Sequence, residues 1–377
     1  MTAPTPRTRC WAEIDCAALR HNARAVRTRV GPDATILAVV KADGYGHGMG
    51  PVARALAAEG ISDFAVANVA EAIILRGHQP DARITILSTA LPDERPEIVR
   101  QNFLPWVSSL DEARDYARLS MRLRDNNNGG NPFPIVAAVD TGMGREGVLP
   151  DDLPALSRIS EEMPGILVTG IITHLPSADE DAAFTSDQLA RFDALLADCL
   201  PTADYHAQNS AGLFAFGLGA RRRVVRPGLS LYGSSPLPEF QSLLRPALTL
   251  KTRVTLVRTL PAGHGVSYGR TFVTSHPTRV GTLAAGYADG YPRHLSNVGA
   301  SVLVRGRRCP VLGRVTMDQI LIGLDALPEV EAGEPVVLLG RQGTEEIPAA
   351  ELAARSGTIP WEIFTGLSAR VGRYYFG

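Results

Sequence analysis

Short apolar runs alternate with amphipathic helical segments over the first two thirds of the chain, and this rhythm limits the folds that it can adopt. Each run has the length of a buried strand and is followed by helical spacing of apolar residues. The alternation indicates parallel strands joined by helices, and both a closed (β/α)8 barrel and a doubly wound open sheet fit it. The expected strands cover residues 36–40, 64–67, 84–87, 106–108, 135–139, 168–173, 204–208 and 223–225.

Polar side chains at the ends of these strands favour the barrel. Lys41, His174, Asn209 and Arg226 fall at the carboxyl ends of four different expected strands. Barrel enzymes assemble their sites at that end, from several strands at once. We therefore predict an α/β fold with a TIM-type (β/α)8 barrel over residues 14–244.

The residue pattern of the sequence changes near residue 245. Helical periodicity fades there, and short β-rich runs separated by Gly and Pro take over. We expect a second, C-terminal, mostly-β domain over residues 245–377, with one short helix at 349–355. A short strand near Trp11, at the end of residues 1–13, is expected to pack with this domain rather than with the barrel.

Three polar positions have the pattern of helix starts. Asp15 follows the N-terminal strand, so it is expected to cap the next helix. Ser109-x-x-Glu112 and Thr185-x-x-Gln188 have the spacing of capping boxes. These patterns predict that helices begin near residues 109 and 185.

The bulk composition is that of an ordinary globular protein. A chain of 377 residues with 45% hydrophobic and 20% charged residues suits two domains with ample core. The formal net charge of -1 provides no electrostatic case for nucleic acid or an anionic membrane. No apolar stretch approaches the ~20 residues that cross a bilayer, and the N-terminus lacks the apolar region of a secretory signal. We therefore expect a cytoplasmic protein.

The cysteines agree with that compartment. Cys10, Cys16, Cys199 and Cys309 show neither C-x-x-C pairing nor the spacing of metal ligands. We expect them to be free thiols in a reducing cytoplasm, with no disulfide and no zinc or other metal site.

Lys41 is the first candidate for chemistry. It ends an apolar strand and precedes a glycine-rich turn that carries Tyr45 and His47. Desolvation at the rim of a core lowers the pKa of an amine, and a neutral amine can form a Schiff base. From the strand and turn alone, a lysine that points into water explains the pattern equally well.

The whole string over residues 39–48, Val-Val-Lys-Ala-Asp-Gly-Tyr-Gly-His-Gly, resembles the pyridoxal-phosphate lysine motif of bacterial alanine racemases. The resemblance extends over nearly the whole chain, from about residue 11 to 373. It implies that Lys41 holds pyridoxal 5'-phosphate as an aldimine and that Tyr45 contacts the phosphate.

Further motifs follow the later strands, each with an ordinary local explanation. Arg145 lies in a glycine-rich loop, where a surface arginine is common, but its fork also suits a carboxylate. His174 at a strand end is often structural, and Ser210 has the position of a helix N-cap. Gly228 and Leu229 follow the last strand, in the region where barrels bind phosphate.

The resemblance assigns roles to these positions. It implies that Arg145 meets the substrate carboxylate, that Arg226 faces the pyridine nitrogen and that Asp179 lines the entrance. It implies further cofactor contacts by Leu87, His174, Asn209, Ser210, Gly228 and Leu229.

Arg226 has a consequence for the reaction. A guanidinium cannot hand its proton to the pyridine nitrogen, so the ring remains a weaker electron sink. Such a ring favours proton exchange at Cα over decarboxylation or transamination, whose enzymes usually pair that nitrogen with a carboxylate.

The second domain supplies the remaining candidates. Racemisation needs a proton-transfer group on each face of a planar carbon, and the resemblance makes Tyr268 the second base opposite Lys41. It also implies an entrance tyrosine, Tyr287, and a pair at the substrate carboxylate, Met317 and Asp318. In this family the β domain of one subunit completes the site of the other, which implies a homodimer with shared sites.

Three departures from the family pattern stand out. Ala138 lies where many relatives carry a lysine that orients the substrate arginine, so something else, such as a chloride or a nearby amide, is needed for Arg145. Ala369 replaces a tyrosine that several relatives place near the phosphate. Residues 126–131 form an unusual Asn- and Gly-rich insertion.

We therefore predict an alanine racemase that interconverts L- and D-alanine by two-base proton transfer on pyridoxal phosphate. Its product would serve peptidoglycan synthesis, or the enzyme would act in alanine catabolism. A serine or broad-specificity racemase is an alternative. A non-catalytic pyridoxal-phosphate carrier and an amino-acid decarboxylase of the same plan are two more.

Overall fold

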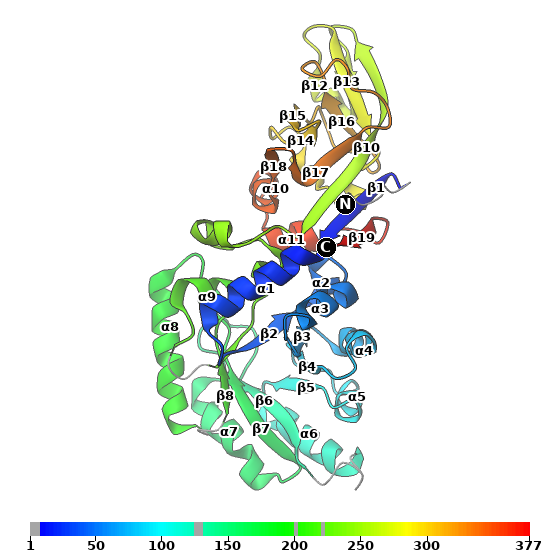
Figure 1. Cartoon of the computed structure of the whole chain (residues 1–377). Helices are drawn as coiled ribbons and strands as arrows, with labels where there is room; N and C mark the ends of the chain where they lie inside the picture. Colours follow the sequence, from blue (N-terminus) through cyan, green and yellow to red (C-terminus); the bar gives the residue numbers. More distant parts are fainter. Residues whose placement is uncertain (1–7, 124–130, 200–202, 220–222) are drawn as a thin grey trace.

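The structure is a computed structural model that describes residues 8–123, 131–199, 203–219 and 223–377. It consists of a closed barrel of eight parallel strands and a mostly-β C-terminal domain, as predicted (Figure 1). The Asn- and Gly-rich insertion lies almost entirely outside the described residues. In the part that the structure describes, no helix has both the length and the apolar character needed to cross a membrane.

The barrel strands are short and buried on both faces, because helices cover the outside and side chains fill the inside. The final strand pairs in parallel with the first and closes the barrel. In order around the barrel, the strands are β2 (Thr35–Val39), β3 (Asp63–Val66), β4 (Arg83–Ile86), β5 (Leu104–Val107), β6 (Phe133–Ala138), β7 (Ile166–Ile172), β8 (Asp204–His206) and β9 (Val224–Val225).

Amphipathic helices surround the barrel and turn their apolar faces toward it (Figure 1). A short, irregular helical turn, α2 (Lys41–Tyr45), lies at the carboxyl end of β2. The outer helices are α1 (Cys16–Val30), α3 (Met49–Ala57), α4 (Val69–His78), α5 (Arg95–Arg100), α6 (Leu110–Leu123), α7 (Leu153–Glu162), α8 (Ala182–Leu195) and α9 (Ser210–Phe216).

Two of the three predicted helix starts are confirmed. The Asp15 carboxylate accepts a hydrogen bond from the Ala18 amide, and the Ser109 hydroxyl accepts one from the Glu112 amide at 3.1 Å. The prediction for Thr185 is wrong. Helix α8 begins one turn earlier, because Asp181 caps it through the Phe184 amide, and Thr185 is buried inside the helix.

A nine-stranded sheet forms most of the second domain, and its long central strand is β10 (Leu248–Leu260). The N-terminal strand β1 (Cys10–Asp15) lies between β10 and the last strand of the chain, β19 (Gly372–Phe376). The other members are β13 (Thr278–Leu283), β14 (Ser301–Val304), β15 (Arg307–Pro310), β16 (Ile320–Gly323), β17 (Pro335–Gln342) and β18 (Glu345–Ile347). Strands β11 (Gly265–Val266) and β12 (Phe272–Val273) form a separate hairpin.

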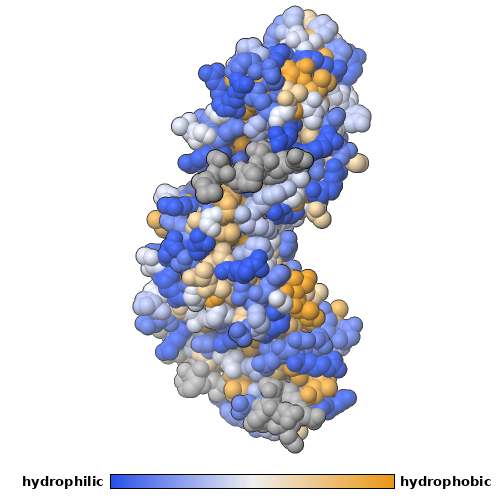
Figure 2. Space-filling view, turned by 45° about the vertical axis from the view of Figure 1, so that its right-hand side comes forward, coloured by the Kyte–Doolittle hydropathy of each residue, from blue (hydrophilic) through white to orange (hydrophobic). Residues whose placement is uncertain are grey.

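The C-terminal region contains two helices where one was predicted. Helix α10 (Ala349–Ser356) matches the expectation, and α11 (Pro360–Thr365) was missed. Six residues are too few to show a helical period, so only the proline at its start could have indicated it. The whole chain is elongated, with a concave flank between its upper and lower parts (Figure 2).

Helix α11 of the second domain packs against the turn that follows β2 of the barrel. The close approach needs glycine at residue 46, since a Cβ there would lie 2.2 Å from the Phe364 carbonyl oxygen. The rings of His47 and Phe364 are in edge contact, with centroids 5.1 Å apart. Arg373 donates a hydrogen bond to the Gly46 carbonyl at 3.2 Å. The two parts of the chain are therefore in firm contact next to Lys41.

Candidate active site

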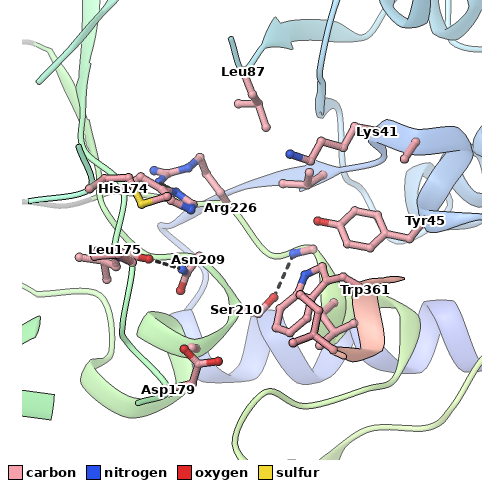
Figure 3. A pocket seen from close by; sticks show the side chains of 18 of the residues that line it. Lys41, Tyr45, Leu87, His174, Leu175, Asp179, Asn209, Ser210, Arg226 and Trp361 are labelled. Atoms are coloured by element: carbon pink, nitrogen blue, oxygen red, sulfur yellow. Dashed lines mark hydrogen bonds between the residues drawn. The ribbon is translucent and has the colours of Figure 1, made fainter. Parts of the chain in front are cut away.

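A cavity of about 530 Å³ opens at the carboxyl end of the barrel strands (Figure 3). It lies where a barrel of this kind carries its active site. Eleven of the predicted residues line it: Lys41, Tyr45, Leu87, Arg145, His174, Asp179, Asn209, Ser210, Arg226, Gly228 and Leu229.

The turn after β2 aims Lys41 and Tyr45 into this cavity (Figure 3). Its backbone is left-handed, with φ of 51° at Ala42 and 52° at Asp43, a conformation that costs about 1–2 kcal/mol for a residue with a Cβ. The Glu71 carboxylate holds the strained turn by accepting a hydrogen bond from the Ala42 amide at 2.8 Å. Strain that is held in this way is common at functional sites.

The environment of Lys41 prepares its amine for reaction. Burial lowers the pKa of Lys41, and the nearby Arg145 guanidinium lowers it further, although the carboxylates of Glu71 and Glu146 oppose the effect. A lowered pKa increases the fraction of neutral amine at physiological pH. The neutral amine is the form that attacks a carbonyl group or accepts a proton.

Arg226 is buried at the floor of the cavity, and its two terminal nitrogens have different surroundings. Nη2 donates to the Thr173 carbonyl at 2.8 Å and contacts His174 Nδ1 at 3.3 Å. Nη1 is buried with no hydrogen-bond partner among the described residues. Because an unmade bond from a buried charged group is costly, this N–H calls for an acceptor inside the cavity.

His174 is a neutral acceptor at this site. Burial, with the positive charges of Arg226, Arg145 and Lys41, lowers the pKa of His174 to about 3. The pKa of Arg226 is also lowered by burial and by Arg145, but a guanidinium keeps its proton at neutral pH. The Arg226–His174 pair therefore carries a single positive charge.

The opposite end of the cavity is rich in hydrogen-bond donors. The Ser210 hydroxyl accepts from the Gly228 amide at 3.0 Å and from the Ser230 amide at 3.3 Å. A Cβ on Gly228 would lie 2.3 Å from the Tyr45 hydroxyl, so glycine is required for this approach. Asn209 caps α9 beside them through the Gly212 amide. These donors follow β8 and β9, the place where barrels bind phosphate.

The four candidates from the second domain lie outside this cavity. Tyr268 is 72% exposed, and β12, which follows it, lies at the end of the domain remote from the barrel (Figure 1). Met317 and Tyr287 are 53% and 41% exposed. Asp318 pairs with Arg370 at 2.9 Å. A single chain thus brings eleven of the predicted site residues together and leaves these four apart.

These four residues nevertheless share one region. The Tyr287 amide donates to the Thr316 carbonyl at 3.0 Å, which holds the Tyr287 turn against the loop of Met317 and Asp318. The Ser267 hydroxyl, next to Tyr268, donates to the Arg314 carbonyl at 2.6 Å. The loops that carry Tyr268, Tyr287, Met317 and Asp318 are therefore packed together, and we call them the second-domain loops.

The structure also shows the surroundings of Ala138 and Ala369, two of the departures from the family pattern. A small cavity of about 20 Å³ borders Ala138, Arg145 and Trp106, which is room for one water molecule. Ala369 is exposed and does not line the main cavity.

Several lining residues were missed from the sequence. Trp106 at the end of β5 lies under Arg226, whose guanidinium carbon is 5.6 Å from the centre of the indole ring. Its place at a strand end was a usable signal. Ile359, Trp361 and Thr365 come from α11 and its start, so no rule about barrel strands could have found them.

The site fits pyridoxal phosphate in three respects. It has a primary amine of lowered pKa, a buried Arg226 N–H for which the described residues provide no acceptor, and a cluster of donors at a glycine that approaches Tyr45 closely. Among the described residues, no group of three or more His, Cys, Asp or Glu is placed to hold a metal ion. The fold and the site together define a barrel-type pyridoxal-phosphate enzyme that acts on amino acids.

Comparison with known proteins identifies the family. The models of the alanine racemase N-terminal and C-terminal domains match residues 14–236 and 247–375. The alanine racemase of Symbiobacterium thermophilum is 43% identical over 375 residues, which cover 97% of each chain. The chain belongs to the alanine racemase family, whose members are pyridoxal-phosphate-dependent isomerases.

Solved structures agree over the whole length. The alanine racemase of Streptomyces lavendulae matches with a TM-score of 0.90 at 36% identity, covering 99% of this chain and 98% of that one. The enzyme of Bartonella henselae, with covalently bound pyridoxal phosphate, matches with a TM-score of 0.88 at 30% identity, covering 98% of this chain and 100% of that one. The predicted fold, cofactor and racemase activity are thereby confirmed.

Proposed function

We propose that alanine is racemised between two bases, Lys41 of one subunit and Tyr268 of the partner subunit. The observation that carries this assignment is the amine of lowered pKa in a cavity that lacks the chain's own Tyr268. His174 is a poor second base, because its pKa of about 3 leaves little driving force for accepting a proton.

The side chains divide the work in the following way. Bound pyridoxal phosphate supplies an electron-withdrawing ring that makes the Cα proton of alanine removable. Lys41 Nζ removes the Cα proton of D-alanine on one face, and the partner's Tyr268, as a phenolate, removes that of L-alanine on the other. In each direction the opposite group, in its protonated form, returns a proton to Cα. The Arg145 guanidinium holds the substrate carboxylate. Arg226, whose Nη1 has no partner among the described residues, would face the ring nitrogen without giving up its proton, which would confine the chemistry to proton exchange.

The proposal includes a homodimer with shared sites, located in the cytoplasm. The second-domain loops expose Tyr268, Met317 and Tyr287, and none of these side chains lines the chain's own cavity. In a two-fold dimer, each second domain can face the barrel of the other subunit, so both sites are completed at once. We assign residues 14–244 to the cofactor-binding barrel and 245–377 to the domain that serves the partner. Strand β1 joins the second domain, because it pairs with β10 and β19.

The experiment that tests the two bases is solvent-deuterium incorporation at Cα in the Tyr268→Phe variant. Racemisation must fall equally in both directions, because the two enantiomers have equal free energy. The rate at which the Cα proton of each enantiomer exchanges for deuterium is measured separately, because each rate reports on the base that removes the proton from that enantiomer. We expect L-alanine exchange to fall by roughly 10²-fold or more, whereas D-alanine still exchanges through Lys41 without inverting.

Tyr374→Phe on β19 provides the matched control. This substitution also removes one phenolic hydroxyl, but Tyr374 does not line the cavity. Equal exchange of both enantiomers in the Tyr268→Phe variant contradicts the assignment. The decarboxylase alternative has little support, because the matched racemase models cover both parts of the chain and Arg226 occupies the place of a carboxylate. Release of carbon dioxide from alanine would revive it.

A further inference from the structure

Trp361 enters the cavity from the second domain of the same chain. It is the second residue of α11, and its indole lines the cavity on the side of Ser210 and Tyr45, away from His174 (Figure 3). None of the roles proposed above uses it. A large aromatic side chain at this place therefore needs an explanation.

The position of the indole is fixed by the contacts of α11. The helix packs on the Lys41 turn through the close approach of Gly46 to the Phe364 carbonyl and through the His47–Phe364 ring contact. Arg373 adds hydrogen bonds to the Gly46 and Leu367 carbonyls. The indole itself is half-buried and packs against the hydrophobic core. Helix α11, which carries Trp361, is thus held against the turn that carries Tyr45.

The indole nitrogen has no hydrogen-bond partner in the part of the chain that the structure describes. An indole N–H only donates, and it usually finds an acceptor when the ring is partly buried. Ser210 and Tyr45 at this end of the cavity carry hydroxyls that can donate, and the Gly228 amide lies beside them, where it donates to Ser210. An anion with several acceptor oxygens suits such a set, and the cofactor phosphate is one.

We propose that Trp361 is a cofactor-binding residue whose indole N–H donates to the phosphate of pyridoxal phosphate. The ring also covers that end of the cavity, which keeps water from the bond and strengthens it. The second domain thereby serves two sites: the second-domain loops act on the partner, and α11 binds the cofactor of its own chain. The inference rests on the family's cofactor and not on the identity of the two bases.

The test compares two ligands on the full-length chain stripped of cofactor. Pyridoxal 5'-phosphate and pyridoxal form the same covalent link to Lys41, but only the first carries a phosphate. We expect Trp361→Phe, which keeps the ring and removes the N–H, to weaken pyridoxal-phosphate binding roughly 10- to 100-fold. The affinity for pyridoxal should stay unchanged, which also shows that the variant is folded.

Trp11→Phe is the matched control, because that indole N–H is already used by Glu13 and Trp11 does not line the cavity. It should leave both affinities unchanged. If Trp361→Phe binds pyridoxal phosphate as the wild type does, or loses both ligands equally, the hydrogen bond to phosphate is ruled out. A wild-type chain that binds neither ligand would instead contradict the cofactor itself.

Intrinsic tryptophan fluorescence provides a second readout, and Trp361→Leu provides a second variant for the binding measurement. Pyridoxal phosphate next to an indole quenches its emission by energy transfer, so the wild type should show stronger quenching on binding than Trp361→Phe. Trp361→Leu should weaken pyridoxal phosphate at least as much as Trp361→Phe, since it removes the ring as well as the N–H. Equal quenching in the wild type and Trp361→Phe would mean that Trp361 does not lie at the cofactor.

Discussion

At the scale of single residues, the proposed function depends most on Lys41. Its amine has a lowered pKa because of burial and Arg145, and a strained left-handed turn held by Glu71 aims it into the cavity. Replacing it with alanine should remove both the covalent attachment and one base. We expect Lys41→Ala to lower racemisation by at least ~10³-fold and to abolish the absorption band of the lysine–cofactor link. Retention of that band would show that another amine holds the cofactor.

Three histidines whose pKa is lowered in the folded chain predict how stability depends on pH. Burial lowers the pKa of His174 to about 3 and of His47 to about 4, and it lowers the pKa of His206 well below the usual range. The unfolded chain binds protons at these sites from about pH 6.5 downward and the folded chain does not, so acidification favours unfolding. The stability is fully present above about pH 6.5 and is lost as the pH falls toward the folded values.

The measurement for this prediction is the urea midpoint between pH 7.5 and 5. Each histidine can contribute up to about 1.4 kcal/mol per pH unit in that window. His47→Asn should flatten the dependence by about one such increment. Carboxylates of lowered pKa, such as Glu351 beside Arg308, lose their contribution only at lower pH, which keeps the two effects apart. A midpoint that does not change down to pH 5 would contradict the prediction.

At the scale of the elements, the sequence predicted the barrel strands well and the helices unevenly. The strands are short apolar runs with a polar residue at the end, and this pattern survives because both faces are buried. The pattern at Thr185 misled because Asp181, one turn earlier, is the better cap. Helix α11 was missed because six residues are too few to show a helical period, and its packing against a turn more than 300 residues earlier leaves no local pattern in the sequence.

The contact between α11 and the Lys41 turn can be tested with two glycines. Gly46 and Gly60 have nearly the same left-handed φ, +74° and +77°, but only Gly46 approaches another element, the Phe364 carbonyl, while Gly60 faces open space. Gly60→Ala should therefore cost only the backbone strain, about 1 kcal/mol. Gly46→Ala should cost a further ~2 kcal/mol or more, since the added methyl forces α11 away.

The two variants are compared by urea unfolding and by titration with pyridoxal phosphate. We expect only Gly46→Ala to weaken cofactor binding, because it displaces the turn that carries Lys41 and Tyr45. Equal losses of stability in both variants would mean that the packing of α11 on the turn contributes little.

At the scale of the whole molecule, one chain explains only part of the site. Residues at the ends of barrel strands could be predicted from their positions, since the fold brings all strand ends to one place. The second-domain loops have no such rule, and only the resemblance pointed to Tyr268, Met317 and Asp318. The structure shows why: Tyr268 and Met317 are exposed, Asp318 pairs with Arg370, and none of the three lines the cavity of Lys41.

Shared sites predict that two inactive variants restore each other. Lys41→Ala and Tyr268→Phe chains, unfolded or dissociated together and reassembled, should form mixed dimers in which one site has both defects and the other has none. Random reassembly makes half of the dimers mixed, so activity should return to about a quarter of the wild-type value. Each variant reassembled with itself should stay inactive. If each site were built within one chain, every site in the mixture would carry a defect and no activity would return.

The control pairs a chain that carries both substitutions with a wild-type chain. With shared sites, each site of this mixed dimer has one defect, so the mixed dimer should be inactive. If a neighbour merely stabilised a weak subunit, the wild-type chain would keep its own site active in the mixed dimer.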